Sequence, residues 1–330
     1  MNPGQIALFS LESDAEFATA VARYLDLEPG AHEERDFGDG EHKIRPLESV
    51  RDRDVYVVQS LYGDPQCSVN DRLVKTLFFL GALRDAGAAR LTAIFPYLGY
   101  ARKDRRTKSR DPLSTRYLAQ VVEAMDVDRV ATIDVHNVSA FENSFRAHTE
   151  TLSARNLFID HFAATPDPER LCVASPDTGG IKRAESFREG LEQRLEREVT
   201  SAFLEKKRSE GEVSGQSRVT GDVRDRDVIV YDDLIASGTT MTRAAAAFLG
   251  AGARSVHAAA THGLFSGESD RILDTDDLAG IVITNTVPPF RLTSDAVRGK
   301  LEVLDASDFV GQVIERLNTG GSVQALLGIE

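Results

Sequence analysis

Short apolar runs alternate with longer segments of helical spacing along most of the chain. Runs rich in Val, Ile and Ala are typical of strands buried on both faces of a parallel sheet. Such strands are expected at Asp54–Gln59, Arg90–Phe95, Arg129–Asp134, Leu171–Ser175, Asp227–Tyr231 and Ser255–Thr261. Helices are expected between strands, at Leu73–Ala86, Thr115–Ala124, Ala184–Val199 and Met241–Leu249. Strands that alternate with helices predict an α/β fold with parallel central sheets.

The chain also repeats part of its own sequence. Val-Arg-Asp-Arg-Asp-Val occurs at residues 50–55 and 223–228, and Phe-Leu-Gly-Ala occurs at residues 79–82 and 248–251. A six-residue match could be a polar turn that precedes any strand. The matched order of strand, helix and strand instead favours a duplicated α/β unit. We therefore expect two tandem Rossmann-like domains, residues 1–155 and residues 156–330.

Composition narrows the class of protein. Of the 330 residues, 42% are hydrophobic, which excludes a disordered tail and provides enough apolar surface for two cores. The 39 Lys and Arg face 52 Asp and Glu, giving a net charge of −13, whereas nucleic-acid binders usually carry the opposite sign. The two cysteines, Cys67 and Cys172, are too few for a disulfide framework. No run approaches the ~20 apolar residues of a membrane span, so we expect a cytoplasmic protein without nucleic-acid or membrane partners.

The strongest local signal follows the strand predicted at Asp227–Tyr231. Two acids end this strand, and small or hydroxyl residues then lead into a helix: Asp232, Asp233, Ala236, Ser237, Gly238, Thr239 and Thr240. Backbone N–H groups at a helix N-terminus bind phosphate well, and hydroxyl groups add further donors. The acids could orient sugar hydroxyls or bind hydrated Mg²⁺. An ordinary capped helix start is the alternative, but the combination of residues favours a phosphate site.

A basic segment lies in this otherwise acidic chain. Residues 102–110 contain six cations and no apolar side chain, so they cannot be buried. They follow the predicted strand at 90–95 at its carboxyl end, where α/β sheets hold their ligands. We expect a flexible basic loop at residues 102–112 that closes over a polyphosphate and excludes water. A solvated loop or a nucleic-acid patch is the alternative.

Further polar residues stand at the ends of two other predicted strands. His136 follows one strand, and Asp177 follows another within Asp-Thr-Gly-Gly. Together they could hold Mg²⁺, although a structural histidine and an ordinary tight turn are the alternatives. Lys206 and Arg208 belong to a charged cluster that could stabilise a moving phosphoryl group or could simply be solvated. No P-loop, Gly-x-Gly-x-x-Gly, His-Glu-x-x-His or nucleophile elbow is present, which disfavours those enzyme classes.

Ordered motifs over nearly the whole chain resemble those of the ribose-phosphate pyrophosphokinase family. They are Phe37–Glu41, Pro96–Arg102, Asp134–His136, Pro176–Gly180, Lys206–Arg208, Asp232–Thr240 and Thr261–Ser266. The resemblance implies two phosphoribosyltransferase-like domains and a role in nucleotide biosynthesis. It also implies Mg²⁺-dependent transfer of the β,γ-diphosphoryl group of ATP to the 1-hydroxyl of ribose 5-phosphate, with release of AMP.

The resemblance implies roles for particular residues as well. The ATP site would comprise Phe37, Asp39, Gly40, Glu41, Arg102 and Lys103, with Phe37 reaching in from a neighbouring subunit. His136 and Asp177 would serve the metal, and Lys206 with Arg208 would stabilise the transferring group. Asp232, Asp233 and residues 236–240 would hold ribose 5-phosphate. A polar β-turn is the alternative for Phe37–Glu41, and a homo-oligomer, a hexamer or a dimer-based assembly, is implied.

The chain departs from the family pattern at three positions. Ala236 stands where family members usually carry Asp, Thr239 stands where they carry Gly, and Lys103 replaces the usual Gln. Loss of one carboxylate removes an acceptor for a ribose hydroxyl. Two other functions therefore stay open: a phosphoribosyltransferase that consumes the diphosphorylated sugar, and a catalytically silent homologue that binds an active synthetase.

Overall fold

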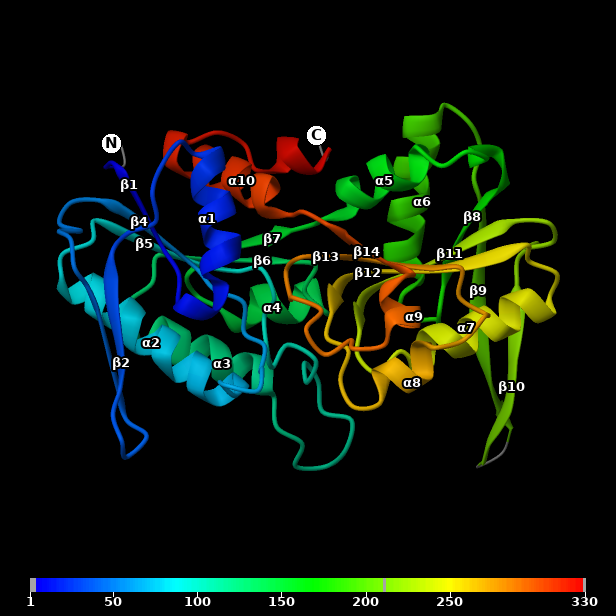
Figure 1. Ribbon diagram of the computed structural model, residues 1–330, viewed down its shortest axis with the longest axis horizontal. Helices are drawn as coiled ribbons and strands as arrows, with labels where there is room; N and C mark the ends of the chain where they lie inside the picture. Colours follow the sequence, from blue (N-terminus) through cyan, green and yellow to red (C-terminus); the bar gives the residue numbers. More distant parts are fainter. Residues whose placement is uncertain (1–3, 210–211, 329–330) are drawn as a thin grey trace. The chain divides into compact units, whose positions relative to one another are not determined.

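The computed structural model describes residues 4–209 and 212–328, and the side chains of all of these except residues 206–217. The chain divides into two compact units, Met1–Ser153 together with Ala306–Glu330, and Ala154–Asp305 (Figure 1). The division predicted near residue 155 lies beside this boundary, but the assignment of residues 306–330 to the second domain is wrong. Helix α10 (Ser307–Thr319) packs instead against α1 (Ala15–Tyr24) of the first unit, because its apolar face is buried there.

The first unit is built on a parallel sheet in the order β1-β4-β5-β6-β7. Its strands are β1 (Ile6–Phe9), β4 (Asp54–Val58), β5 (Arg90–Phe95), β6 (Arg129–Ile133) and β7 (His148–Leu152). Figure 1 shows α1 and α10 on one face of this sheet and α2 (Val69–Asp85) and α3 (Ser114–Glu123) on the other. The antiparallel hairpin of β2 (His32–Asp36) and β3 (His42–Pro46) is separate, and α4 (Val138–Ser144) connects β6 to β7.

The second unit is built on a sheet in the order β10-β9-β8-β11-β12-β13-β14, in which only the described β9–β10 pair is antiparallel. Its strands are β8 (Leu171–Ser175), β9 (Thr200–Ser209), β10 (Glu212–Thr220), β11 (Asp227–Ile235), β12 (Ser255–Gly263), β13 (Gly280–Thr284) and β14 (Leu301–Leu304). Its helices are α5 (Arg155–Ala163), α6 (Ile181–Leu195), α7 (Thr239–Gly250), α8 (Ser269–Leu273) and α9 (Asp295–Arg298). The predicted α/β fold with parallel sheets is therefore confirmed.

Two boundaries in the second unit differ from the sequence prediction. Strand β11 continues through the two acids to Ile235, because it keeps pairing with β12 as far as Gly263. The helix predicted to reach Val199 ends at Leu195, where Glu196 adopts a left-handed conformation with φ of 53°. Thr200 can then start β9 by pairing with Cys172.

The duplicated unit predicted from residues 50–55 and 223–228 is confirmed at the turn that these segments form. Asp52 and Asp225 have φ of 58° and 56°, and their amides donate to Gly87 O and Gly252 O, each at 3.0 Å. The Phe-Leu-Gly-Ala repeat, however, is out of structural register. The carbonyl oxygen of Phe248 accepts from Ala253 N, and in the first unit the carbonyl oxygen of Leu83 accepts from Ala88 N in the same way. Phe248 therefore corresponds to Leu83 and not to Phe79.

Each unit buries a carboxylate at the start of the strand that follows this turn. Asp54 receives a two-pronged ion pair from Arg90, and Asp227 receives one from Arg254. In the first unit the end of α10 covers the pair, since Asn318 Nδ2 donates to Asp54 Oδ2 at 2.7 Å and Arg90 Nη2 donates to Leu317 O at 2.9 Å. These contacts attach the C-terminal helix to the first sheet.

Asn318→Ala should therefore destabilise the first unit. The substitution removes a hydrogen bond to a buried carboxylate, which costs about 1.5–3 kcal/mol for a charged partner. Urea unfolding followed by circular dichroism measures the loss. The control is Thr319→Ala, because the exposed hydroxyl of Thr319 donates within α10 to Glu315 O; equal losses in both variants would contradict the role given to Asn318.

Candidate active site

The turn between β11 and α7 opens a helix N-terminus whose cap residue, Gly238, makes no side-chain cap, and the long contact of Thr239 N with Ser237 Oγ at 3.5 Å is the side-chain bond described there. Gly238 occupies the cap position with φ of 89°, and a Cβ there would lie 2.5 Å from Leu273 Cδ2, so glycine is required. Thr239 and Thr240 are exposed at the first turn, and Ser237 Oγ lies 3.0 Å from Thr239 Oγ1. Backbone N–H groups and hydroxyls at such a terminus suit a phosphate.

The segment that follows β12 holds this turn in place. Ser266 N donates to Ala236 O at 2.8 Å, and Leu264 N donates to Ile235 O at 2.9 Å. Ser269 Oγ also donates to Ala236 O at 3.3 Å. The Thr261–Ser266 motif therefore supports the backbone of the turn, and Ala236 contributes its carbonyl to that support.

Two acids and one arginine lie at the end of β11. Arg183 Nη1 contacts Asp232 Oδ1 at 2.6 Å and Asp233 Oδ1 at 3.1 Å. Burial, reinforced by the neighbouring Asp233 carboxylate, raises the pKa of Asp232 even with Arg183 beside it. The two acids therefore form a tight pair with Arg183 beside both carboxylates. Sequence reasoning missed Arg183, because only the β8–β11 pairing brings the first turn of α6 to this strand end.

Asp177 shapes the turn at the end of the neighbouring strand β8. Its Oδ1 accepts from Gly179 N at 2.9 Å and from Gly180 N at 3.2 Å. A Cβ on Gly180 would lie 3.8 Å from Asp232 Oδ1, so the two strand ends lie close together. The tight turn considered for this motif is present, and the structure brings Asp177 to the same edge as Asp232 and Asp233.

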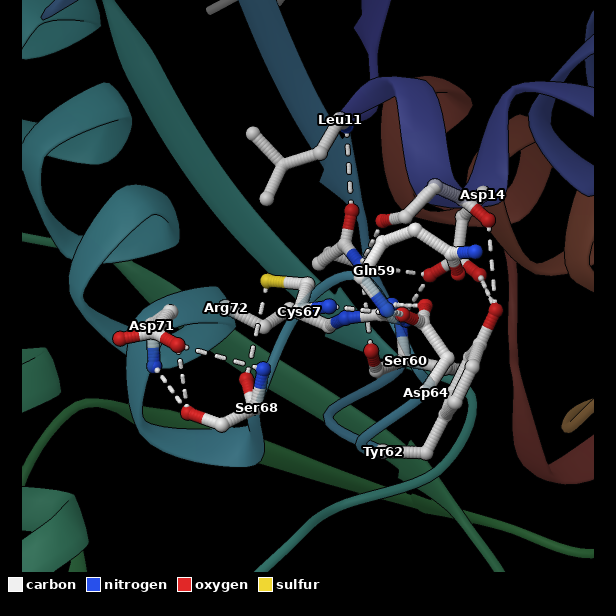
Figure 2. A network of polar contacts seen from close by, with 12 residues as sticks. Leu11, Asp14, Gln59, Ser60, Tyr62, Asp64, Cys67, Ser68, Asp71 and Arg72 are labelled. Atoms are coloured by element: carbon white, nitrogen blue, oxygen red, sulfur yellow. Dashed lines mark hydrogen bonds and ion pairs between the residues drawn. The ribbon is translucent and has the colours of Figure 1, made fainter. Parts of the chain in front are cut away.

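The first unit contains the counterpart of the open turn, and that counterpart is closed. Ser68 caps α2: its Oγ accepts from Asp71 N at 3.2 Å, while Asp71 Oδ2 accepts from Ser68 N at 3.2 Å (Figure 2). This reciprocal capping box engages the first donors of α2, whereas at the start of α7 Thr239 N makes only a long contact of 3.5 Å with Ser237 Oγ among the described residues. Among the described residues, the helix start after this turn is therefore closed by a capping box in the first copy and lacks one in the second.

A buried polar network lies beside the closed turn (Figure 2). Asp14 Oδ2 accepts from Gln59 Nε2 at 2.7 Å and from Ser60 N at 2.6 Å, and Tyr62 OH donates to Asp14 Oδ1 at 3.2 Å. The fully buried Arg72 guanidinium lies 3.9 Å above the Tyr62 ring and is ion-paired with Asp64. Burial raises the pKa of Asp14 to about 6.

This network fixes the start of the basic loop. Ser60 Oγ accepts from Tyr97 N at 3.1 Å, and Leu61 N donates to Tyr97 O at 2.8 Å. A Cβ on Gly99 would lie 2.6 Å from Leu61 O, so the backbone approaches closely there. The Pro96–Arg102 motif is thus anchored on the β4–α2 connection before the loop leaves the sheet.

The basic loop is exposed, as predicted, and is closed by its own carboxylate. Asp111 Oδ2 accepts from Lys103 Nζ at 2.5 Å, Thr107 Oγ1 at 2.8 Å and Lys108 N at 2.8 Å. These hydrogen bonds, that of Lys103 first, hold the pKa of Asp111 well below its usual range. Arg102 is exposed, whereas Lys103 is half-buried and engaged. Sequence reasoning missed Asp111, although an acid at the end of a basic run is a signal for such closure.

His136 lies at the same sheet edge as the start of the basic loop. It is exposed directly after β6, and the next residue, Asn137, caps α4 by accepting from Ala140 N at 3.1 Å. Asn137 Nδ2 also donates to Asp104 Oδ2 at 2.5 Å. The structure therefore places His136 next to the Arg102–Asp104 segment within the first unit.

The remaining predicted residues lie elsewhere in their units. Residues 37–41 form the tip of the β2–β3 hairpin, with Phe37 N donating to Glu41 O at 2.7 Å, so the polar turn considered for them is present. Phe37 is 40% exposed, and this tip is well separated from the basic loop in Figure 1. Lys206 and Arg208 belong to β9, but their side chains lie outside the described part of the structure.

Comparison with known proteins decides the family. The N-terminal domain of ribose phosphate pyrophosphokinase matches residues 6–125, and the phosphoribosyl synthetase-associated domain matches residues 200–328. A ribose-phosphate pyrophosphokinase of Hyphomonas neptunium is 35% identical over 97% of this chain and 98% of its own length. This chain belongs to the ribose-phosphate pyrophosphokinase family.

Other pyrophosphokinases support this assignment over the same length. The ribose-phosphate pyrophosphokinase of Gloeobacter violaceus is 33% identical over 99% of this chain and 94% of its own. The crystal structure of phosphoribosylpyrophosphate synthetase from Mycobacterium smegmatis is 30% identical, with a TM-score of 0.85 over 96% of this chain and all of that chain. The predicted family is therefore confirmed, and the match over both units disfavours a single-domain phosphoribosyltransferase.

The carboxylates at the sheet edge fit a divalent metal whose remaining ligands are substrate oxygens. Among the described residues, no group of three or more His, Cys, Asp or Glu side chains is arranged around a metal position. Carboxylates of Asp177, Asp232 and Asp233 nevertheless gather at one edge. Mg²⁺ typically takes one or two carboxylates and completes its coordination with phosphates and water, so a pyrophosphokinase needs no cage made of protein alone.

The described helices include none that could span a membrane.

The buried Asp14 makes a testable contribution to the pH dependence of stability. Its pKa rises from 3.8 to about 6 on folding, so the folded state binds the proton more tightly and the free energy of unfolding falls as pH rises through that interval. Asp14→Asn should remove this fall, which amounts to about 3 kcal/mol at most. Urea unfolding of both proteins across the interval measures it.

Glu33→Gln is the matched control for Asp14→Asn. Hydrogen bonds from Arg45 and Lys43 lower the pKa of the Glu33 carboxyl, so its contribution is lost as pH falls and has the opposite sign. If wild type and Asp14→Asn lose stability equally between pH 4 and pH 6, the titration assigned to Asp14 is wrong.

Proposed function

We propose that this pyrophosphokinase transfers the β,γ-diphosphoryl group of ATP to the 1-hydroxyl of ribose 5-phosphate, giving 5-phosphoribosyl 1-diphosphate and AMP. The observation that carries the proposal is the uncapped turn at residues 236–240 beside Asp232 and Asp233, in a chain whose full-length relatives are ribose-phosphate pyrophosphokinases. Neither a phosphoribosyltransferase nor a silent partner is favoured by those relatives.

Ribose 5-phosphate would bind at the open turn. Its phosphate would accept from the backbone N–H groups and hydroxyls of Ser237 and Gly238, which precede α7, and of Thr239 and Thr240, which begin it. Asp232 and Asp233 would accept from ribose hydroxyls, with Arg183 fixing the orientation of both carboxylates. Ala236 offers only backbone and a methyl group, so its carbonyl supports the turn and its side chain adds no acceptor.

ATP would bind through residues of the first unit. Arg102 and Lys103 would contact its phosphates, and Lys103 would exchange its bond to Asp111 for one to a phosphate oxygen. Phe37, Asp39, Gly40 and Glu41 would contact the adenine of a neighbouring copy. The hairpin tip stands apart from the basic loop of its own unit, which supports this division between copies.

A homo-oligomer, either a hexamer or a dimer-based assembly, completes this proposal. Pairs of large apolar side chains spaced four residues apart are exposed on two helices of the first unit. They are Val74 and Phe78 on α2, exposed by 39% and 57%, and Tyr117 and Val121 on α3, exposed by 49% and 42%. Such exposed apolar surface favours burial against another subunit.

Positioning and charge neutralisation would provide most of the catalysis. The anomeric oxygen attacks the β-phosphorus in line, the bond from that phosphorus to the α,β-bridging oxygen breaks, and AMP leaves. Lys206 and Arg208 would stabilise charge on the transferring group. Substrate oxygens would hold Mg²⁺, which would neutralise phosphate charge, and His136 of the first unit and Asp177 of the second are each proposed as metal ligands.

Phosphorus NMR tests the reaction directly. Purified protein with ATP, Mg²⁺ and ribose 5-phosphate should produce AMP together with a new 1-diphosphorylated sugar, and neither product should form without the sugar. Lys206→Ala is the matched variant and should lower kcat by orders of magnitude while ATP binding persists. ATP binding without sugar-dependent AMP in the wild type would instead support the silent homologue.

The departure at Ala236 gives a second test. Ala236→Asp should lower the KM for ribose 5-phosphate, because a hydrogen bond from a sugar hydroxyl to a carboxylate is worth about 1.5–3 kcal/mol. Steady-state kinetics with the sugar as varied substrate measures the change. Ala236→Asn is the control for size and should have a smaller effect; an unchanged KM in Ala236→Asp would contradict the missing-acceptor explanation.

A further inference from the structure

A cavity of about 390 Å³ lies in the second unit at the amino ends of its strands. Leu171, Asp227, Ser255 and Gly280, which begin or adjoin the starts of β8, β11, β12 and β13, contribute to its lining. The open turn at residues 236–240 follows the carboxyl end of β11. The cavity therefore belongs to the opposite sheet edge from the proposed sugar site, and its size suits a small ligand.

The first unit shows what the corresponding edge binds. Asp54, the repeat counterpart of Asp227, accepts from the carboxamide of Asn318 at 2.7 Å, while Arg90 donates to the carbonyl of Leu317 at 2.9 Å. An amide N–H donor thus bonds to the carboxylate, and a carbonyl acceptor bonds to the guanidinium. In the second unit the same kind of pair lines the cavity.

Asp227 and Arg254 retain hydrogen-bonding capacity for a ligand. Arg254 donates from Nε and Nη2 to Asp227 and from Nη1 to Asp167, so two of its five N–H groups have no partner among the described residues. Asp227 Oδ2 accepts one of these bonds and has a further lone pair. Arg254 lies one position before Ser255, the pairing partner of Asp227, whereas Arg90 pairs directly with Asp54.

Rings and charged groups complete the lining. His161, Phe162 and His257 line the cavity, and the rings of Phe162 and His257 meet edge to face with centroids 6.3 Å apart. Burial lowers the pKa of His257, and no described residue forms a hydrogen bond with its ring. Two permanent cations, Arg254 and Lys300, face three carboxylates, Asp167, Asp227 and Glu302, which disfavours an anionic ligand.

We propose that this cavity binds a small neutral aromatic amide, whose N–H group donates to Asp227, whose carbonyl accepts from Arg254 and whose ring packs among the aromatic side chains. The ligand repeats in one small molecule the contacts that the end of α10 makes in the first unit. Aromatic amides in this sense include simple carboxamides and lactam rings. This site is independent of diphosphoryl transfer, so its test does not depend on the proposed function.

Benzamide and benzoate test the proposal as a matched pair of probes. They share the ring and differ in the amide, which benzoate replaces with a carboxylate. Benzamide titrated into the full chain should shift the imidazole signals of His161 and His257 saturably in ¹H–¹⁵N spectra, with a Kd on the order of 1 mM. Benzoate should leave both signals in place, because the carboxylates of the lining repel it.

Two variants separate the proposed contacts from nonspecific binding. Asp227→Asn should weaken benzamide binding about tenfold, as expected for loss of one charge-assisted hydrogen bond. His257→Phe keeps a ring at the cavity and provides the second test if Asp227→Asn fails to fold; it should retain benzamide binding within a few-fold, and His161 then reports it. Absence of any shift at tens of millimolar benzamide, or equal shifts with benzoate, would overturn the proposal.

Discussion

The parallel arrangement of the strands determines where this molecule can carry out chemistry. In each unit the carboxyl ends of neighbouring parallel strands meet at one edge, and the turns that leave this edge hold most candidate residues. Arg102 and Lys103 follow β5, His136 follows β6, Asp177 follows β8, and Asp232 with Asp233 ends β11. The sheets thus bring together at one edge side chains from distant parts of the sequence.

Duplication of this unit produced two copies that use their edges differently. At the carboxyl edge, the second copy leaves the start of α7 uncapped, whereas the first closes the start of α2 with Ser68 and Asp71. At the amino edge, the first copy covers its Asp54–Arg90 pair with α10, whereas the second leaves Asp227 and Arg254 facing a cavity. The difference in helix capping and the difference in cover of the carboxylate–arginine pairs both come from side chains that the two copies do not share.

Much of the fold could be predicted from the sequence, because strands buried on both faces leave continuous apolar runs. Strands β5 and β8 match their predicted bounds, and the turn at residues 50–55 recurs at 223–228 as expected. The position of residues 306–330 could not be predicted, since it depends on a buried carboxylate distant in sequence, Asp54. The same limit applies to Arg183, which only strand pairing brings to Asp232.

The site could be predicted where a local motif carries the chemistry and not where the fold assembles it. Backbone amides at residues 236–240 follow from a strand, a Gly and a helix in sequence. The closure of Lys103 by Asp111 and the burial of Arg72 against Tyr62 depend on loop conformation and on packing between α2 and the β4 end. Such contacts leave no periodic signal in the sequence.

The central claim is that only the second copy of the duplicated unit offers an open anion site among the described turns. Amide ¹H–¹⁵N spectra recorded with increasing ribose 5-phosphate, without ATP, test it most directly. The account predicts saturable shifts at Gly238, Thr239 and Thr240, with the amides at the start of α2, Asn70 and Asp71, unchanged. Shifts at the start of α2, with the start of α7 unaffected, would contradict it.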